Sequence, residues 1–281
     1  MIPQNFEYAA PGSLKEALAL LSNGEARVLA GGMSLIPMMK LRLAAPEKLI
    51  DLGRVPGLSG ITEEAGSIRI GAMTTHHEIE DSALLRAKCP LLAEAAANIG
   101  DVQVRNMGTI GGSVAHADPA ADYPASLLAL EAKVRLVSNG SERTLSLEEF
   151  LVDTMTTAIE PGEILQEVIV PVENPAVGVN YQKMVQPASG FAIVGVAARV
   201  AKTNGKPVFV RVGVTGLAGK AYRASGVEKV LLETGDVMKA AAVVANGVDA
   251  NSDLFASADY RKHMAQVYTA RALTQALAGA A

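Results

Sequence analysis

The alternation of apolar and polar residues in the first 55 positions predicts one helix and then a strand–helix–strand unit. Ser13-Leu14-Lys15-Glu16 is a capping box, and the apolar residues Leu14, Ala17, Leu18 and Leu21 fall on one helical face. Gly24 stands where such a helix ends. Residues 27–30 and 48–52 have the short apolar runs of strands. Two strands at this distance, joined by a helix, favour a small parallel βαβ unit.

Residues 56–173 mix the two periodicities, which predicts an α+β region with a mixed or antiparallel sheet. The strand-like stretches are 67–73, 133–137, 144–147 and 164–170. The helix-like stretches are 90–99, which is rich in alanine, and 119–132. We therefore expect a first domain over 1–173, with subdomains of about 1–55 and 56–173.

The segment 171–178, with two prolines and a glycine, reads as a linker to a second domain over 178–281. Three strands are expected at 180–186, 191–201 and 208–217, the last two forming a hairpin that turns at Lys202-Thr203-Asn204-Gly205. Helices are expected at 225–234, 236–247 and 259–279. On the last helix the recurring apolar residues are Tyr260, Met264, Val267, Ala270, Leu273 and Leu277.

Composition narrows the classes of protein that the chain could belong to. The 281 residues carry a net charge of −4, which gives no reason to expect a nucleic-acid partner. The one cysteine, Cys89, excludes an internal disulfide and a cysteine-ligated iron–sulfur cluster held by this chain alone. We find neither a signal peptide nor a run of about 20 apolar residues that could span a membrane, so we expect a cytoplasmic protein.

Two glycine pairs are the strongest chemical signal. Ala30-Gly31-Gly32-Met33-Ser34 and Thr109-Ile110-Gly111-Gly112-Ser113 each join a strand-like run to a helix start. In the first, Ser34 is suited to cap a helix that carries Pro37 in its first turn. Such turns can present free backbone N–H groups, and glycine lets a phosphate approach them. Each pair alone is equally consistent with turn geometry, but together they favour a nucleotide or dinucleotide cofactor.

Several polar residues allow two interpretations. His116, Asp118 and Asp122 include metal-ligand types, but helix capping by Asp118 before Pro119 is the favoured reading, and Asp122 could accept a hydrogen bond from a cofactor. Other titratable residues read as structural. His76 and His77 fit a solvated first helical turn with Thr74 or Thr75 as its N-cap, His263 an exposed helix position, and Cys89 a packed thiol.

Basic residues near the glycine pairs are equally open. Arg105, Lys40 and Arg42 could neutralise phosphate or be solvated at the surface. Lys183, beside Tyr181, could touch a cofactor that bridges two domains or line a sheet edge.

Longer motifs around the pairs resemble a known family, the FAD-carrying medium subunits of molybdenum hydroxylases, which include aerobic carbon monoxide dehydrogenase and the FAD domain of xanthine dehydrogenase. Residues 30–43, AGGMSLIPMMKLRL, resemble its first flavin-binding signature. The second signature is matched by 103–113, QVRNMGTIGGS, followed by DPAADYPA at 118–125. The resemblance extends to 157–165, 181–183 and 260–264, and is greatest to the carbon monoxide dehydrogenase type.

The resemblance implies an α+β fold in which FAD lies between two subdomains, followed by a C-terminal domain of three antiparallel strands and helices. The two glycine loops would hold the pyrophosphate and its adjacent ribose, Ile99 would lie near the adenine, and 186–193 would approach the isoalloxazine ring. The cofactor-binding residues implied are Val28, Leu29, Ala30, Gly31, Gly32, Met33, Ser34, Leu35, Ile99, Thr109, Ile110, Gly111, Gly112, Ser113, Asp122, Leu165, Lys183 and Phe191.

The implied function is electron transfer within a larger oxidoreductase. A small subunit with [2Fe–2S] clusters would supply electrons, a large molybdopterin subunit would oxidise the substrate, and two heterotrimers would pair. No catalytic residue is then expected in this chain, and FAD does the redox chemistry. The alternatives are a self-sufficient FAD-dependent oxidase or NAD(P)H dehydrogenase of related fold, and a non-catalytic module that has lost FAD.

The chain departs from the family pattern at three places. Met33 stands where close relatives often carry histidine, and Gln186-Pro187-Ala188-Ser189 replaces a stretch that is usually basic. Phe191 stands where tyrosine is common, and phenylalanine has no hydroxyl to donate to a flavin. The changes at 186–189 and at Phe191 bear on the flavin's redox potential, the orientation of its ring and the electron acceptor, whereas Met33 would contribute only its backbone, so we expect FAD binding to survive there.

Overall fold

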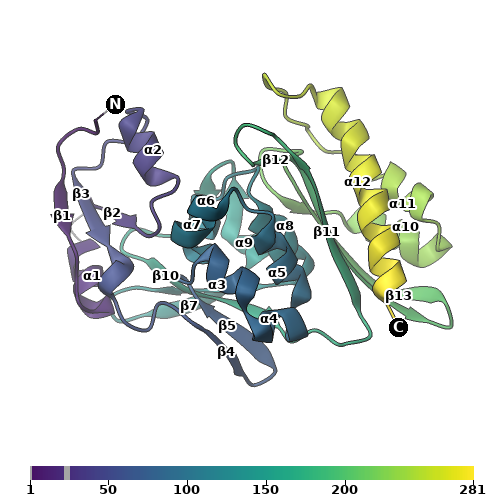
Figure 1. Ribbon diagram of the computed structural model, residues 1–281, viewed down its shortest axis with the longest axis horizontal. Coiled ribbons are helices and arrows are strands. Elements are labelled where there is room, and N and C mark those ends of the chain that lie inside the picture. Colours follow the sequence, from purple (N-terminus) through teal and green to yellow (C-terminus); the bar gives the residue numbers. More distant parts are fainter. Residues whose placement is uncertain (1, 22–25) are drawn as a thin grey trace.

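A computed structural model describes residues 2–21 and 26–281, so Gly24, the predicted end of the first helix, lies outside the described residues. Three structural units follow one another along the longest axis of the molecule (Figure 1). The N-terminal unit lies at one end and the C-terminal domain at the other, with a sheet and its helices between them.

The N-terminal unit is the predicted parallel βαβ unit with one strand added. Its elements are β1 (Glu7–Ala9), α1 (Leu14–Leu21), β2 (Ala26–Leu29), α2 (Leu35–Lys40) and β3 (Lys48–Asp51). The sheet order is β1-β3-β2, and both pairings are parallel. In the predicted capping box the Ser13 hydroxyl accepts the N–H of Glu16, whereas the Glu16 carboxylate accepts the N–H of Gly12.

The middle unit is an antiparallel sheet of the order β4-β5-β10-β6-β7. Its strands are β4 (Ile61–Glu64), β5 (Ser67–Gly71), β6 (Lys133–Val137), β7 (Glu142–Ser146) and β10 (Ile164–Pro171). The side chains of Ile68 and Ile70 alternate with polar residues and are fully buried, as the period of a one-sided strand requires. A short 3-10 helix, η1 (Leu52–Arg54), connects the N-terminal unit to this sheet.

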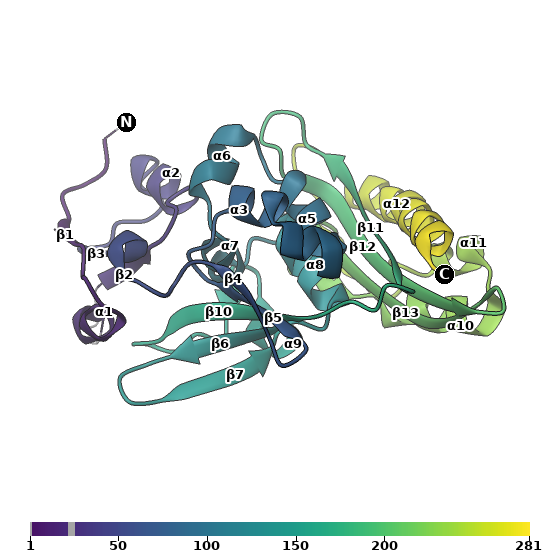
Figure 2. The same cartoon turned by 60° about the horizontal axis from the view of Figure 1, so that its bottom comes forward.

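Short helices gather on one face of that sheet (Figure 2). They are α3 (His76–Asp81), α4 (Ala83–Lys88), α5 (Pro90–Ala97), α6 (Val102–Met107), α7 (Ile110–His116), α8 (Asp122–Ala129) and α9 (Leu147–Phe150), and a small ribbon of β8 (Leu151–Asp153) and β9 (Thr156–Thr157) follows. The helix predicted over 119–132 begins at Asp122, after a turn that Asp118 closes by accepting the N–H of Ala120, and it ends at Ala129. That turn contacts the C-terminal domain, since the carbonyl of Ala120 accepts the N–H of Ala192.

The C-terminal domain contains the three predicted antiparallel strands, β11 (Gly178–Val185), β12 (Ala192–Thr203) and β13 (Lys206–Thr215). A two-residue strand that was not predicted, β14 (Tyr222–Arg223), adds to the edge. The predicted hairpin turn is confirmed: Asn204 and Gly205 both have positive φ, which the tight turn between β12 and β13 needs.

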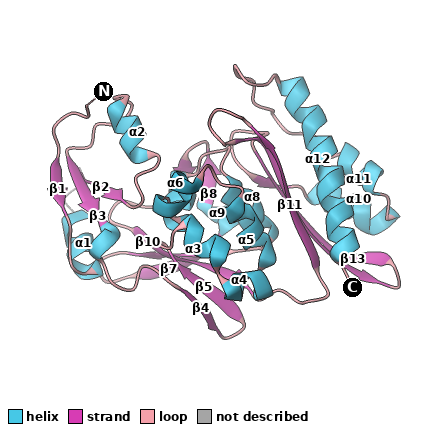
Figure 3. Ribbon diagram, in the orientation of Figure 1, coloured by secondary structure: helices cyan, strands magenta, loops and turns pink. Residues whose placement is uncertain are grey.

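Helices α10 (Ser225–Thr234), α11 (Val237–Ala242) and α12 (Ala258–Gly279) complete this domain, and α12 crosses the sheet lengthwise (Figure 3). The helix predicted over 236–247 ends five residues early, where the chain enters turns. Of the apolar residues that recur on α12, Leu273 is fully buried and Met264 and Leu277 pack against the core of the domain, whereas Tyr260 is exposed. Buried residues that the apolar pattern did not include are Arg261, Ala265, Thr269, Ala272 and Ala276.

Strand β12 explains how the domains join. It is buried along Ala192–Val200 because α8 of the first domain contacts it, and α12 also packs against it. The predicted linker is also held by a buried ion pair: Arg199 donates to both carboxylate oxygens of Glu173, at 2.5 and 2.9 Å. Arg199 donates in addition to the carbonyl of Ala129 at 2.8 Å. The connection between the domains is therefore packed and charged rather than free.

Candidate functional site

The first glycine loop leaves backbone N–H groups free. It links β2 to α2, and Gly32 has φ +73°, a conformation that favours glycine. The N–H groups of Met33, Ser34 and Leu35 have no acceptor among the described residues, and only Ile36 resumes the helical pattern by donating to Gly32. Ser34 occupies the N-cap position, but its hydroxyl makes no capping bond, so that part of the prediction is wrong. Adjacent free amides at a strand-to-helix turn suit an anion.

The second glycine loop differs, because most of its amides are already used. Ile110 and Gly111 donate to carbonyls of Thr74 and Ala72, Gly112 donates to the Thr109 hydroxyl at 3.1 Å, and Ser113 donates to the Thr109 carbonyl. The prediction of a second set of free amides in Gly111–Ser113 is therefore wrong. What this loop leaves available is the Ser113 hydroxyl, which has no hydrogen bond to a described residue.

The two loops nevertheless lie against each other. A methyl group at Gly31 would overlap the carbonyl oxygen of Met107, and one at Gly112 would lie 3.5 Å from the Ala30 side chain. A methyl at Gly108, the residue after Met107, would lie 2.5 Å from Nε2 of His76. The first glycine pair thus has two roles: it lets the N-terminal unit approach the middle unit closely, and it precedes the free amides of the loop.

The structure brings the predicted residues Asp122 and Lys183 together in a buried charged cluster at the boundary of the two domains. Asp122 begins α8, and Lys183 lies on β11, with its ammonium 2.8 Å from Oδ2 of Asp122 and 2.7 Å from the carbonyl oxygen of Asn98. The hydroxyl of Tyr181, two residues before Lys183 on the same side of the strand, donates to Oδ1 of Asp122 at 2.5 Å. Strand β11 is an edge strand of its sheet, but the Lys183 side chain is 1% exposed and is directed at Asp122, so it does not face solvent. A contact between Lys183 and a cofactor stays a prediction.

Burial dominates the electrostatics of this cluster. It raises the pKa of the Asp122 carboxyl to about 6, although Lys183 and the Tyr181 hydroxyl both act to lower it. Burial next to Asp122 also raises the pKa of Tyr181 well above its usual value, so this hydroxyl remains a donor. The pair is a carboxylate and an ammonium inside the protein, each with at least one further hydrogen bond.

The segment expected near the isoalloxazine ring, residues 186–193, packs against Gly100. Residues 186–191 form a tight turn in which Gln186 and Phe191 are hydrogen bonded through the backbone, and the Phe191 side chain is 41% exposed. Gly190 lies so close to Gly100 that a methyl on it would be 3.1 Å from the Gly100 Cα. Ile99, half-buried, precedes Gly100, so Ile99, Phe191 and Lys183 come from neighbouring segments.

The remaining predicted residues fall into two groups. Val28 and Leu29 end β2 beside the first loop, whereas Leu165 is buried on β10 in the core beneath α7. Of the three basic candidates, Arg105 is engaged with Glu80 at 2.8 Å and with the carbonyl of Ile99 at 3.1 Å. Lys40 and Arg42 are exposed on and just after α2.

The histidines and the cysteine differ in how deeply they are buried. His76 is buried, 3.2 Å from the Tyr123 hydroxyl, so the prediction that it is solvated is wrong; burial and then Arg105 lower its pKa to about 4. His77 and His263 are exposed, and Thr75 forms the predicted N-cap.

Cys89 is a packed thiol, and its burial raises the pKa of this thiol to about 12. His116 lies 4.0 Å from Asp118, and no metal-type cluster occurs among the described residues.

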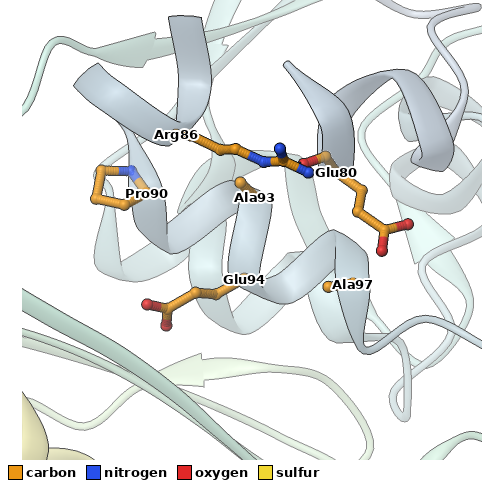
Figure 4. Close-up of a pocket in the computed structure, with 6 residues that line it drawn as sticks. All are labelled: Glu80, Arg86, Pro90, Ala93, Glu94 and Ala97. Atoms are coloured by element: carbon orange, nitrogen blue, oxygen red, sulfur yellow. The ribbon is translucent and has the colours of Figure 1, made fainter. Parts of the chain in front are cut away.

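A hollow of about 270 Å³ lies on the helical face, and none of the predicted site residues lines it (Figure 4). Glu80, Arg86, Pro90, Ala93, Glu94 and Ala97 line it. Its acidic residues have partners: Glu80 binds Arg105, and Glu94 accepts the backbone N–H of Tyr181 at 3.0 Å. The hollow therefore borders the charged cluster without containing any of its residues.

Sequence reasoning missed three contributors to the site. Tyr181 binds Asp122, Asn98 binds Lys183, and Gly100 receives the 186–191 turn. The alternation of a strand was the one available signal, because it places Tyr181 and Lys183 on the same face. Within the described residues, no helix has the length and hydropathy that crossing a bilayer requires.

Free amides at a strand-to-helix turn, a second glycine loop against it and a buried charged pair at a domain boundary define a binder of a phosphate-bearing cofactor. Residues 4–173 match the model of the FAD binding domain in molybdopterin dehydrogenase, and residues 179–276 match the CO dehydrogenase flavoprotein C-terminal domain. The chain belongs to this family of flavoprotein subunits. It is an oxidoreductase component whose cofactor is FAD, as predicted.

Known relatives resemble the chain over its whole length. It is 41% identical to the carbon monoxide dehydrogenase medium chain of Hydrogenophaga pseudoflava over 99% of both chains, and 35% identical to the glyceraldehyde dehydrogenase medium chain of Sulfolobus acidocaldarius over 98% of this chain and 99% of that one. A solved carbon monoxide dehydrogenase structure from H. pseudoflava superposes with a TM-score of 0.97, covering all of both chains at 41% identity. These matches confirm the predicted fold class.

Proposed function

We propose that this chain is the FAD-carrying electron-transfer subunit of a heterotrimeric molybdenum hydroxylase of the carbon monoxide dehydrogenase type. It takes electrons from a [2Fe–2S] partner subunit and passes them to an external acceptor. The observation that carries the proposal is the match of both domains, in order and at full length, to carbon monoxide dehydrogenase medium chains. Cys89, the one cysteine, is buried, and an iron–sulfur cluster normally needs four thiolates, which supports placing the clusters on a partner.

The residues of the chain fit FAD as the bound group. The free N–H groups of Met33, Ser34 and Leu35 would receive its pyrophosphate, and Gly32 allows the backbone to turn toward it. Asp122 and Lys183, with the turn that carries Phe191, would orient the flavin end. FAD, when bound, supplies the electron-accepting and electron-donating chemistry, and the protein binds it and tunes it.

The proposed assembly has a large molybdopterin subunit, a small [2Fe–2S] subunit and this chain, with two heterotrimers pairing. Substrate oxidation then takes place on the large subunit, and this chain needs no catalytic residue of its own. Native mass spectrometry of the complex isolated through this chain tests the proposal. One FAD with one large and one small partner per chain supports it. A lone flavin-bound chain that turns over NAD(P)H would instead support the self-sufficient flavoenzyme.

The phosphate assignment is tested by Gly32→Asp and Gly112→Asp. A carboxylate at position 32 would lie beside the free amides, and one at 112 would enter the contact between the loops, so both variants should lose most of their FAD. Gly57→Asp is the matched control for Gly32→Asp, because Gly57 also has positive φ, with no atom within 4 Å of an added methyl. Normal flavin absorbance in the Gly32 and Gly112 variants would contradict the assignment.

A further inference from the structure

Both oxygens of the Asp122 carboxylate are bound by side chains of one strand, β11. Oδ1 accepts the Tyr181 hydroxyl at 2.5 Å and Oδ2 accepts the Lys183 ammonium at 2.8 Å. Asp122 is 4% exposed, so water cannot readily replace either donor. A hydroxyl that donates to a carboxylate forms a short, charge-assisted bond, which restricts rotation of the carboxylate. The Tyr181 hydroxyl therefore helps to decide which way Oδ2 points.

Tyr181 is itself held from several sides. Its ring is buried, and its backbone N–H donates to the carboxylate of Glu94 on α5 at 3.0 Å. Its hydroxyl occupies the space that Gly195 leaves on the neighbouring strand, because a methyl there would lie 2.5 Å from the hydroxyl oxygen. A buried tyrosine anchored at both ends has little freedom to follow a moving carboxylate, so it acts as a fixed reference.

Lys183 depends on that reference. Its ammonium has three N–H donors, and the described residues provide two acceptors, Asp122 and the carbonyl of Asn98. The third N–H has no acceptor in the described part of the chain. With the side chain 1% exposed, this donor is directed by its two protein partners rather than by solvent.

We propose that Tyr181 is a positioning residue of the flavin site, which holds Asp122 so that Asp122 and Asn98 together fix the Lys183 ammonium toward FAD. This inference rests on the proposed function, in which Lys183 faces the cofactor. Reduction places additional electron density on the flavin, which a fixed ammonium stabilises. Tyr181 thus raises the reduction potential of the bound flavin without needing to touch it.

The test is the midpoint potential of FAD in the purified complex, measured by spectroelectrochemical titration of Tyr181→Phe. Loss of the Tyr181 hydroxyl frees the carboxylate that orients Lys183 and should weaken the preference for reduced over oxidised FAD by up to about tenfold, the full contribution of a hydrogen bond to a charged group. For a two-electron couple this lowers the potential by up to about 30 mV. Tyr222→Phe is the matched control: its hydroxyl donates at 2.8 Å to the carbonyl of Val244, within the C-terminal domain.

A double-variant comparison separates positioning from general damage. If Tyr181 acts through Asp122, Tyr181→Phe should shift the potential in the wild type but not in an Asp122→Asn background. Equal shifts in both backgrounds, or a shift no larger than that of Tyr222→Phe, would overturn the inference. Flavin content and thermal midpoint are recorded for each variant. If the wild-type complex contains no FAD, it is the proposed function that fails; if it contains FAD and the potentials coincide, only this inference fails.

Discussion

The middle unit is joined to its two neighbours in different ways. The N-terminal unit meets it through an apolar cluster that includes Val137 and Ile164 and through backbone, with Gly31 against Met107. The C-terminal domain also makes a glycine contact, Gly213 with the carbonyl of Ala125, and adds buried charged side chains, with Arg199 on Glu173 and Lys183 on Asp122. The matched pairs of buried charges distinguish the second joint from the first.

This difference assigns different tasks to the two sides of the site. Glycine contacts bring the free amides of the first loop close to the second loop, which suits a phosphate. Buried charges bring directed donors from β11 to the start of α8, which suits a polar ring system. The two joints should therefore fail under different substitutions.

The largest expected effect is at the charged joint. Arg199→Met leaves the buried Glu173 carboxylate without its partner and should lower the free energy of unfolding by about 3–5 kcal/mol. The double variant Glu173→Gln with Arg199→Met should recover much of that loss, because no unpaired charge remains. Urea unfolding of the purified chain measures both. A double variant less stable than the single one would show that the pair is not the source of the loss.

The backbone joint should respond to a single methyl group. Gly31→Ala places that group on the Met107 carbonyl and should cost up to about 3 kcal/mol, with or without FAD. Gly226→Ala, inside α10 with its nearest atom at 4.0 Å, is the control and should be neutral or slightly stabilising. Equal unfolding midpoints for these two variants would mean that the joint can relax around the methyl.

A fall in pH should destabilise the joint between the N-terminal unit and the middle unit through His76, whose imidazole packs against Gly108. The pKa of His76 is lowered from 6.5 to about 4 in the folded protein, so between these values the unfolded chain takes up a proton that the folded chain refuses. Stability from this residue is therefore lost as pH falls, by about 2 kcal/mol between pH 7 and pH 5. Asp122, whose pKa is raised to about 6, contributes with the opposite sign, so the wild type alone is uninformative.

The measurement is thus the difference in unfolding free energy between wild type and His76→Gln at the two pH values. This difference should shrink by about 2 kcal/mol at pH 5, because the variant has lost the imidazole whose protonation opposes folding. A difference that does not change with pH would contradict a buried, neutral His76.

The smallest expected effects are at the N-cap positions of the two glycine loops, Thr109 before α7 and Ser34 before α2. Thr109→Ala removes the acceptor of the Gly112 N–H and should cost about 1 kcal/mol. Ser34→Ala, at the corresponding position before α2, removes no capping bond and should change stability by less than about 0.5 kcal/mol in the absence of FAD. Thermal unfolding of both apo variants provides the comparison. A larger loss at Ser34 would contradict the open first loop.

Periodicity predicted the elements whose partners are close in sequence. The strands of the parallel unit and of the β12–β13 hairpin were expected within two residues of their observed bounds, and α10 at its observed bounds. Strands β1 and β14 were missed because three and two residues carry no period, and only the neighbouring strand makes them strands. On α12 the apolar pattern included Leu273, which is fully buried, but it did not include Ala272, which is also buried, and it included Tyr260, which is exposed.

The sequence was enough to predict which residues belong to the candidate site, but not which hydrogen bonds they make. Both glycine pairs and the residues Asp122 and Lys183 stand out in the sequence, and resemblance to a family made them specific. Which amides remain free depends on Ala72 and Thr74, which come from a segment about forty residues before the second loop. The burial of His76 likewise depends on Tyr123, 47 residues away.

The pair of Glu173 and Arg199 also bears on inheritance. The two family models meet between residues 173 and 179, which would suggest a natural crossover point for exchanging halves among relatives. The pair spans that point, with the acid on one side and the base on the other. A recombinant whose donor lacked either charge would receive a buried ion with no counterpart, so we expect the two halves to be inherited together, or exchanged only between lineages that have kept both.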